Sequence, residues 1–196
     1  MKFTSDYWEN RYQENTARWD LGVISTPIKE YIDQLDNKEI KIGIPGGGNS
    51  YEAEYLFKNG FSNVYVIDIA ALPLQNIQKR IPDFPKNQLL QKDFFDVALP
   101  FDLIIEQTFF CALDPTLRPA YAKKMHSLLT PQGKITGLLF NVPLYKDHPP
   151  FGGNTEEYKK LFEPYFDIEI MQTATNSVES RSGRELFIKM NKKQLV

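Results

Sequence analysis

Short apolar runs alternate with amphipathic stretches along most of the chain. The apolar runs predict strands, because they are four to eight residues long and are bounded by turn-forming residues. These strands are expected at residues 40–44, 64–67, 88–91, 101–106, 134–140, 166–173 and 184–189. Apolar positions at helical spacing predict helices at residues 5–15, 27–35, 50–58, 70–80, 117–129 and 155–162.

The alternation of strands and helices predicts an α/β fold with a mostly parallel sheet covered by helices on both faces. The last two strands, 166–173 and 184–189, can close the sheet as an antiparallel pair. Pro131 and Gly133 predict a turn between the preceding helix and the strand at 134–140. Ligands of such sheets bind at the carboxyl ends of the strands, where the strand order reverses.

Composition narrows the classes of partner. The chain has 196 residues, a net charge of −2 and a single cysteine, Cys111. We expect one domain, a cytoplasmic location, no nucleic-acid or membrane partner, and a monomer. The apolar runs are too short to span a membrane, and the N-terminus lacks the apolar stretch of a signal peptide. Two histidines and one cysteine predict no metal site.

The strongest chemical signal is a glycine turn that joins a strand to a helix, followed by an acidic residue at the end of the next strand. The turn is Gly46-Gly47-Gly48, directly after Pro45, and the acidic residue is Asp68. A glycine turn lets a ligand approach the backbone, and a carboxylate about 20 residues further on can bind the two hydroxyls of a ribose. This pattern predicts a cofactor that contains adenosine.

The turn favours one adenosine cofactor over another. In the dinucleotide fingerprint the third glycine would stand where this chain has the bulky Tyr51. NAD is therefore disfavoured, and a nucleoside without phosphates, such as S-adenosylmethionine, fits better. Asp93 and Phe94 follow another predicted strand and could contact the adenine.

Several blocks in one order resemble the thiopurine, thiol and halide methyltransferase family, and most closely its plant thiol and halide members. The first block is Trp8-Glu9-Asn10-Arg11-Tyr12 with Trp19-Asp20-Leu21-Gly22. The second is the glycine turn with Asp68. The most specific runs from Phe101 to Pro115, and the last is His148-Pro149-Pro150-Phe151.

The resemblance implies a Rossmann-like class I methyltransferase domain over residues 1–196, with seven strands and S-adenosylmethionine as cofactor. Residues 1–36 would form an N-terminal helical lid, and residues 37–196 the core. The cofactor-binding residues would be Trp8, Tyr12, Trp19, Pro45, Gly46, Gly47, Gly48, Asp68, Ile69, Asp93, Phe94 and Glu106. The residues at the transferred methyl group would be Glu106, Phe140 and Tyr145.

Departures from the family pattern bear on the methyl acceptor. Gln107 stands where thiopurine enzymes have an arginine, which disfavours a thiopurine. Phe140 aligns with a tyrosine of the halide enzymes, and Tyr145 in the following loop could replace the lost hydroxyl. Tyr12 stands where the plant enzymes have a second lid tryptophan.

The chemistry expected is in-line methyl transfer to a small soft nucleophile, which needs proximity and exclusion of water more than a base. A hydroxyl or amine acceptor would instead need Glu106 or His148 as base. Three other hypotheses stay open: an NAD-dependent oxidoreductase, a cofactor-binding module without turnover, and a nucleic-acid methyltransferase.

Overall fold

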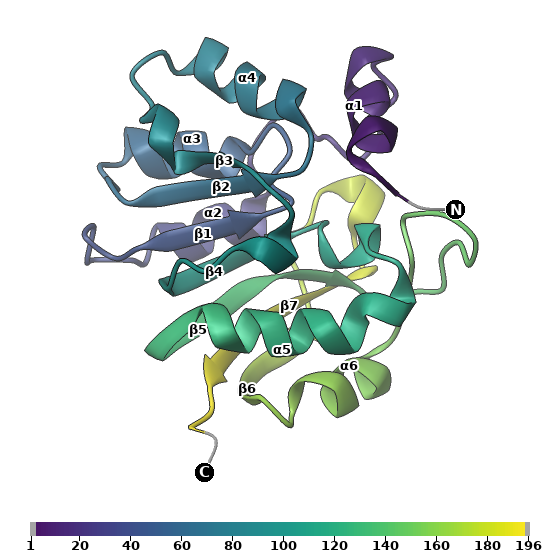
Figure 1. Ribbon diagram of the computed structural model, residues 1–196. Coiled ribbons are helices and arrows are strands. Elements are labelled where there is room, and N and C mark those ends of the chain that lie inside the picture. The colour runs from purple at the N-terminus through teal and green to yellow at the C-terminus, as the bar shows by residue number, and fades with distance from the viewer. Residues whose placement is uncertain (1–2, 195–196) are drawn as a thin grey trace.

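A seven-stranded sheet organises the computed structural model, which describes residues 3–194 (Figure 1). The strands are β1 (Ile42–Pro45), β2 (Val64–Asp68), β3 (Leu89–Gln91), β4 (Phe101–Gln107), β5 (Leu129–Phe140), β6 (Phe166–Thr173) and β7 (Glu185–Lys192). Their order is β3-β2-β1-β4-β5-β7-β6, and β7 runs antiparallel to both of its neighbours. The predicted parallel sheet with an antiparallel closing pair is confirmed.

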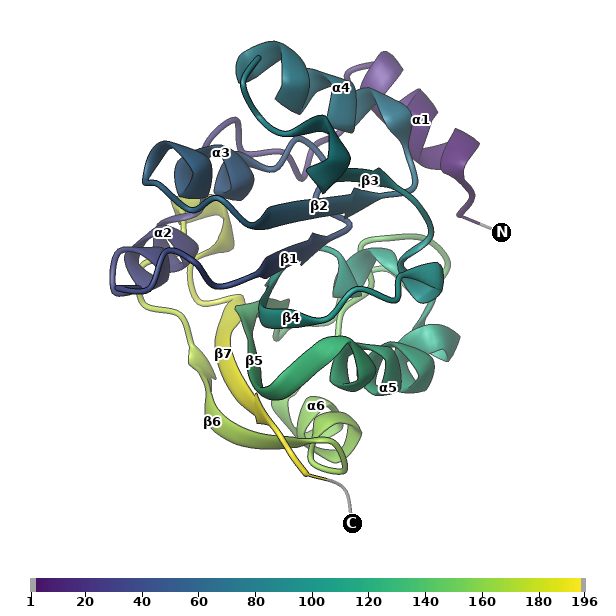
Figure 2. The same cartoon turned by 60° about the vertical axis from the view of Figure 1, so that its left-hand side comes forward.

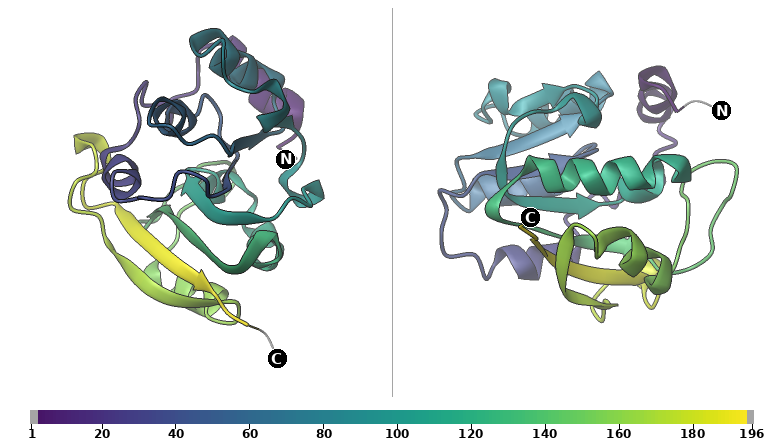
Figure 3. Two further views of the ribbon diagram at one scale, coloured as in Figure 1. Left: turned by 90° about the vertical axis from the view of Figure 1, so that its left-hand side faces the viewer. Right: turned by 60° about the horizontal axis from the view of Figure 1, so that its bottom comes forward.

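Helices cover both faces of this sheet. One face carries α2 (Thr26–Ile32), α3 (Tyr51–Lys58) and α4 (Ala71–Arg80), and the other carries α5 (Arg118–Leu128) and α6 (Thr155–Phe162). Figure 2 shows the two layers on either side of the strands, and the right-hand view of Figure 3 shows the green helices α5 and α6 in front of the sheet. Each layer packs its apolar side chains against one face of the sheet, so the protein has two apolar cores.

Local signals explain where the helices begin and end. The side chain of Ser50 caps α3 by accepting a hydrogen bond from the backbone N–H of Ala53 at 3.4 Å. Asn59 and Gly60 end that helix, and Gly60 adopts a φ of 86° that favours glycine. Asn154 caps α6 in the same way through the N–H of Glu157. These caps fix the residues at which α3 and α6 begin.

Strand β5 begins earlier than predicted. The turn expected at Pro131 and Gly133 lies inside the strand, which starts at Leu129. Leu129 pairs with Phe101, whereas Lys134 already pairs with Leu103, so β5 has extra residues opposite β4. A bulge of this kind accommodates a proline and a glycine without ending the strand, which is why the turn prediction was wrong.

The N-terminal segment divides into two parts with different surroundings. Helix α1 (Ser5–Gln13) has no buried residue and lies beside α4 at the edge of the molecule (Figure 2). Helix α2, in contrast, buries Ile28 and Ile32 completely in the core. The lid expected over residues 1–36 therefore ends before α2, because that helix is part of the core layer. No helix among residues 3–194 is both long and apolar enough to cross a membrane.

Candidate active site

A cavity of about 1080 Å³ opens at the carboxyl ends of the parallel strands. The strand order reverses between β1 and β4, which leaves a crevice outside the sheet at this point. We call the part formed by the turns after β1 to β4 the strand-end half; it contains Gly46, Ile67, Asp68, Ile69, Lys92, Asp93, Phe94, Phe95 and Phe109. The loop half is formed by the N-terminal segment, the segments after β4 and β5 and the segment before β7; it contains Phe3, Tyr7, Arg11, Arg18, Cys111, Asp114, Phe140, Leu144, Tyr145, His148, Ser180, Arg181 and Arg184.

The glycine turn after β1 allows close approach to the backbone. Gly46 adopts a φ of 55°, and a Cβ atom at this position would overlap the ring of Phe109. Gly46 lines the main cavity, whereas Gly47 and Gly48 line a small recess beneath the segment from Trp19 to Val23. Pro45 is buried at the end of β1, behind the turn. Of the four residues predicted here, Gly46 is the one that faces the main cavity.

Asp68 ends β2 at the wall of the cavity and is 7% exposed. One carboxylate oxygen accepts the N–H of Gly48 and the other accepts the N–H of Ala70, each at 2.8 Å. Burial raises the pKa of Asp68 to about 6, and these two N–H groups act in the opposite direction. Each carboxylate oxygen thus uses one of its lone pairs in a hydrogen bond to the backbone.

Asp93 and Phe94 follow β3, as the sequence indicated, and line the same half of the cavity. The carboxylate of Asp93 accepts the N–H of Phe95 at 2.9 Å, which fixes the turn. The ring of Phe94 contacts that of Phe109 edge to face, with centroids 5.2 Å apart. These residues give this part of the cavity an apolar wall, with the carboxylate of Asp93 beside it.

Three aromatic side chains of the N-terminal segment line the cavity: Trp8, Tyr12 and Trp19. Trp19 meets the rings of Trp8 and Tyr12 edge to face, at 5.4 and 5.8 Å. Burial raises the pKa of the Tyr12 hydroxyl far above its ordinary value, so this group stays neutral. We call residues 3–24, which carry these rings, the lid.

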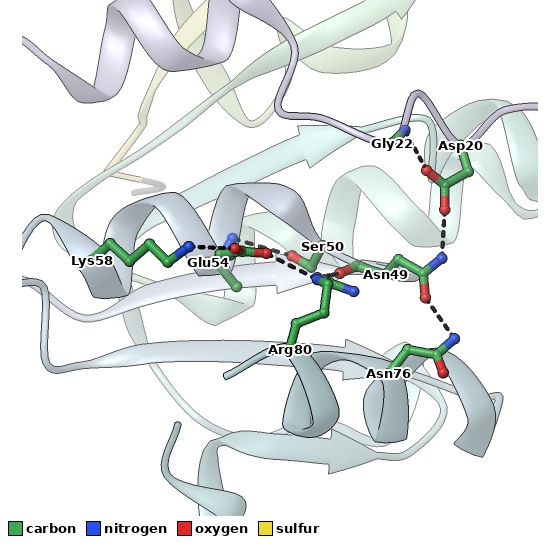
Figure 4. A network of polar contacts seen from close by, with 9 residues as sticks. Asp20, Gly22, Asn49, Ser50, Glu54, Lys58, Asn76 and Arg80 are labelled. Carbon is green, nitrogen blue, oxygen red and sulfur yellow. Dashed lines mark hydrogen bonds and ion pairs between the residues drawn. The ribbon is translucent and has the colours of Figure 1, made fainter. Parts of the chain in front are cut away.

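Several polar contacts fasten the lid to the core, and two of these places involve its carboxylates. In α1, the carboxylate of Glu9 accepts the first N–H groups of α4, those of Ala71 and Leu72, at 2.8 and 3.1 Å. Figure 4 shows the second place, where Asp20 accepts a hydrogen bond from the side chain of Asn49 at 2.5 Å. Asn49 is held in turn by Asn76 of α4, and its carbonyl oxygen accepts from Arg80.

Glu106 lies in a different environment from the one expected of a base. It is fully buried, and its carboxylate accepts hydrogen bonds from the N–H groups of Phe109 and Phe110 and from the hydroxyl of Tyr121, at 2.8, 2.9 and 2.5 Å. Burial raises the pKa of Glu106 to about 7, and these three donors oppose the shift. The carboxylate fixes the turn that presses Phe109 onto Gly46, and it does not line the cavity. Strand position alone indicated the correct end of the sheet but not the direction of the side chain.

The other two residues predicted at the methyl group, Phe140 and Tyr145, line the loop half. Phe140 is the last residue of β5. Tyr145 is 55% exposed and stacks on His148 with ring centroids 4.1 Å apart. His148 lies at the same rim and contacts the carbonyl oxygen of Pro149 at 2.9 Å. Cys111 also lines the cavity, but burial raises the pKa of its thiol to about 12, so it stays protonated.

Sequence reasoning missed the arginines of the loop half. Arg181 and Arg184 lie in the segment before β7, which carries no motif, and Arg18 precedes Trp19 in the lid. Arg181 donates a hydrogen bond to the carbonyl oxygen of Trp19 at 2.6 Å, across 162 residues of sequence. Two arginines in four residues are a weak signal, and the contact that brings them to the lid depends on the tertiary fold.

A family model described as thiopurine S-methyltransferase matches residues 3–195. The chain belongs to this family. It is 29% identical over 189 residues to the probable thiol methyltransferase 2 of Arabidopsis thaliana, covering 93% of this chain and 83% of the relative. It is 23% identical over 204 residues to the thiopurine S-methyltransferase of Acinetobacter baylyi, covering 91% and 92%.

Solved structures agree on the fold. The 1,6-didemethyltoxoflavin-N1-methyltransferase of Burkholderia thailandensis, solved with S-adenosylhomocysteine, superposes with a TM-score of 0.79 at 13% identity and covers 97% of this chain and 87% of that one. A TehB-like S-adenosylmethionine-dependent methyltransferase of Corynebacterium glutamicum gives 0.66 at 17% identity, with 96% and 98% covered.

This family member is an S-adenosylmethionine-dependent methyltransferase. The cavity fits that cofactor, because Gly46 of the glycine turn and the carboxylate of Asp68 both line it. Membership of this family replaces the hypotheses of an NAD-dependent oxidoreductase and of a cofactor-binding module without turnover. The volume of the cavity lies at the upper end of the range for small-molecule sites, so it has room for a cofactor and a second molecule.

Proposed function

We propose that this enzyme methylates a small soft nucleophile, with a thiol as the first candidate. The observation that carries the proposal is the position of Glu106: its carboxylate is fully engaged inside the protein and does not line the cavity. A thiolate reacts with a methyl sulfonium without a base, whereas an alcohol needs one. Two relatives in Arabidopsis thaliana, the probable thiol methyltransferase 2 and, at 26% identity over 187 residues, thiocyanate methyltransferase 1, support the same class of acceptor.

The cofactor supplies a methyl group on a positively charged sulfur. The residues of the chain position the cofactor and the acceptor and exclude water from them. We propose that Asp68 holds the ribose, that Asp93 and Phe94 hold the adenine, and that Gly46 contacts the cofactor through its backbone. Trp8, Tyr12 and Trp19 exclude water, and each ring close to the sulfonium contributes about 0.5–2 kcal/mol of cation–π attraction. Phe140 and Tyr145 line the wall that receives the acceptor.

The test is a comparison of soft and hard acceptors with methyl-labelled S-adenosylmethionine. The panel contains hydrosulfide, a thiol, thiocyanate, iodide and a thiopurine, set against a phenol and an aromatic amine of similar size. We expect transfer to at least one soft nucleophile and none to the phenol or the amine. Transfer to the phenol alone, lost in His148→Ala, would replace this proposal with base-assisted O-methylation.

We also propose that the enzyme acts as a monomer in the cytoplasm. The single cysteine supports a reducing compartment, because no disulfide can form within the chain. Light scattering on the purified chain tests the monomer, and a mass of twice the chain's 22.7 kDa would contradict it.

A further inference from the structure

The loop half of the cavity carries an excess of positive charge. Its lining contains four arginines, Arg11, Arg18, Arg181 and Arg184. The acidic residue in the same lining is Asp114, which is half-buried and accepts hydrogen bonds from the backbone N–H and the hydroxyl of Thr116. The other acidic residues of the cavity, Asp68 and Asp93, belong to the strand-end half. The two halves therefore differ in charge as well as in construction.

Arg181 is the fixed member of this group. It is 7% exposed, donates to the carbonyl oxygen of Trp19 and pairs with Glu185 at 3.4 Å. Its guanidinium lies 5.8 Å from the centroid of Phe140. Glu185 also accepts from Ser177, so this carboxylate is shared. Arg181 thus joins the lid to the wall of the loop half.

Arg184 and Arg18 are exposed, and their charges are available to a ligand. Within residues 3–194 neither of them forms an ion pair. Arg184 is held through its backbone, since its N–H donates to Arg181 and its carbonyl oxygen accepts from Asn141. A planar guanidinium on a fixed backbone can bind a carboxylate with two parallel hydrogen bonds.

The direction of charge change in methyl transfer limits what these arginines can bind. An anionic sulfur loses its charge as it takes the methyl group, so cations beside it would stabilise the starting state more than the transition state. A group that keeps its negative charge through the reaction is bound equally in both states. The arginines are therefore suited to an anionic group of the acceptor that is separate from the reacting sulfur.

We propose that the acceptor is a small thiol that also carries a carboxylate or an equivalent permanent negative group, and that Arg184, with Arg181 behind it, binds that group. This inference rests on the proposed function, because it takes the reacting atom to be sulfur. The aromatic wall of Phe140 and Tyr145 holds the carbon skeleton between the two ends. Arg184 is a specificity residue in this scheme, since it contacts the acceptor away from the reacting atom.

Three thiols of nearly equal size test the proposal: 3-mercaptopropionate, 2-mercaptoethanol and cysteamine. The group at the end opposite the thiol is negative in the first, neutral in the second and positive in the third. Each is assayed with the wild type and with Arg184→Gln, and Lys123→Gln, an exposed charge on α5 outside the cavity lining, is the matched control. We expect Arg184→Gln to lower kcat/KM for 3-mercaptopropionate roughly tenfold more than for 2-mercaptoethanol, mainly through KM.

Because the variant is compared with the wild type separately for each thiol, the different acidities of the three thiols do not affect the comparison. Arg184→Lys should recover part of the loss, because it restores the charge but not the guanidinium fork. Equal effects of Arg184→Gln on all three thiols would overturn the inference and leave thiol methylation standing. No transfer to any thiol, with cofactor binding intact, would overturn both proposals.

Discussion

The two halves of the cavity are built in opposite ways. The strand-end half comes from short turns at the ends of β1 to β4, and backbone N–H groups hold its acidic side chains in place. The loop half joins parts of the chain that are up to 162 residues apart, through contacts such as Arg181 with Trp19. In our proposal, the sheet therefore determines the position of the residues that hold the cofactor, while loops determine the position of those that bind the methyl acceptor.

The halves also differ in the charges they carry. The strand-end half rests on carboxyl groups whose pKa is raised by burial, Asp68 to about 6 and, behind the wall, Glu106 to about 7. The loop half carries arginines instead. Stability conferred by the first half should therefore depend on pH near neutrality.

The largest effect is expected from Asp68→Ala, which removes the acceptor for the ribose. Hydrogen bonds to a charged group contribute about 1.5–3 kcal/mol each, so losing two should weaken binding of S-adenosylhomocysteine roughly 100-fold or more. Titration calorimetry measures this, with Asp36→Ala, an exposed carboxylate outside the cavity lining, as the control. Affinity within threefold of the wild type would contradict the assignment of the ribose site.

Substitution of Glu106 is expected to have a smaller effect, and to change the free energy of unfolding more than the rate of methyl transfer. Glu106→Ala leaves the N–H groups of Phe109 and Phe110 buried without their acceptor, at a cost of about 3 kcal/mol in the free energy of unfolding. Glu106→Gln keeps an acceptor for these groups and a donor toward Tyr121, and it should retain methyl transfer. Denaturant unfolding and the standard assay measure both; an inactive but stable Glu106→Gln would restore Glu106 as a base.

The same pair of proteins tests the pH dependence. The pKa of Glu106 is raised from 4.5 to about 7 by folding, so the folded protein binds the proton more tightly. Its contribution to stability is complete below about pH 4.5 and is lost as the pH rises through 7. Glu106→Gln should therefore gain stability relative to the wild type over this range, by about 3 kcal/mol. A constant difference between the two proteins would contradict the raised pKa.

The smallest effect is expected where the lid meets the core. Asp20→Ala removes the hydrogen bond to Asn49 and the one to the N–H of Gly22 (Figure 4). The cavity and the glycine turn remain, so the lid should open more often and release S-adenosylhomocysteine roughly tenfold faster, equivalent to about 1.4 kcal/mol. Stopped-flow displacement measures the rate, again with Asp36→Ala as control. An unchanged rate would show that the remaining contacts of Ser5, Glu9 and Trp19 are enough to hold the lid.

Much of the strand-end half could be predicted from the sequence. Gly46, Asp68 and Phe94 follow apolar strands, and parallel strands bring such positions to one edge of the sheet. The loop half was predicted only in part, through Phe140 and Tyr145. Arg181 escaped prediction, because its partner Trp19 lies in a segment that no local pattern links to it.

The sequence alone determined the alternation of strands and helices, the edge at which the site lies and the identity of the turn residues, because these follow from local periodicity and backbone preference. The tertiary structure decided the directions of the side chains. It directed the carboxylate of Glu106 away from the cavity, toward Phe109 and Tyr121, and it placed α2 in the core. It also brought the arginines together in the loop half of the cavity. These outcomes depend on which buried donors and apolar surfaces lie nearby once the chain has folded, and segments distant in sequence supply them.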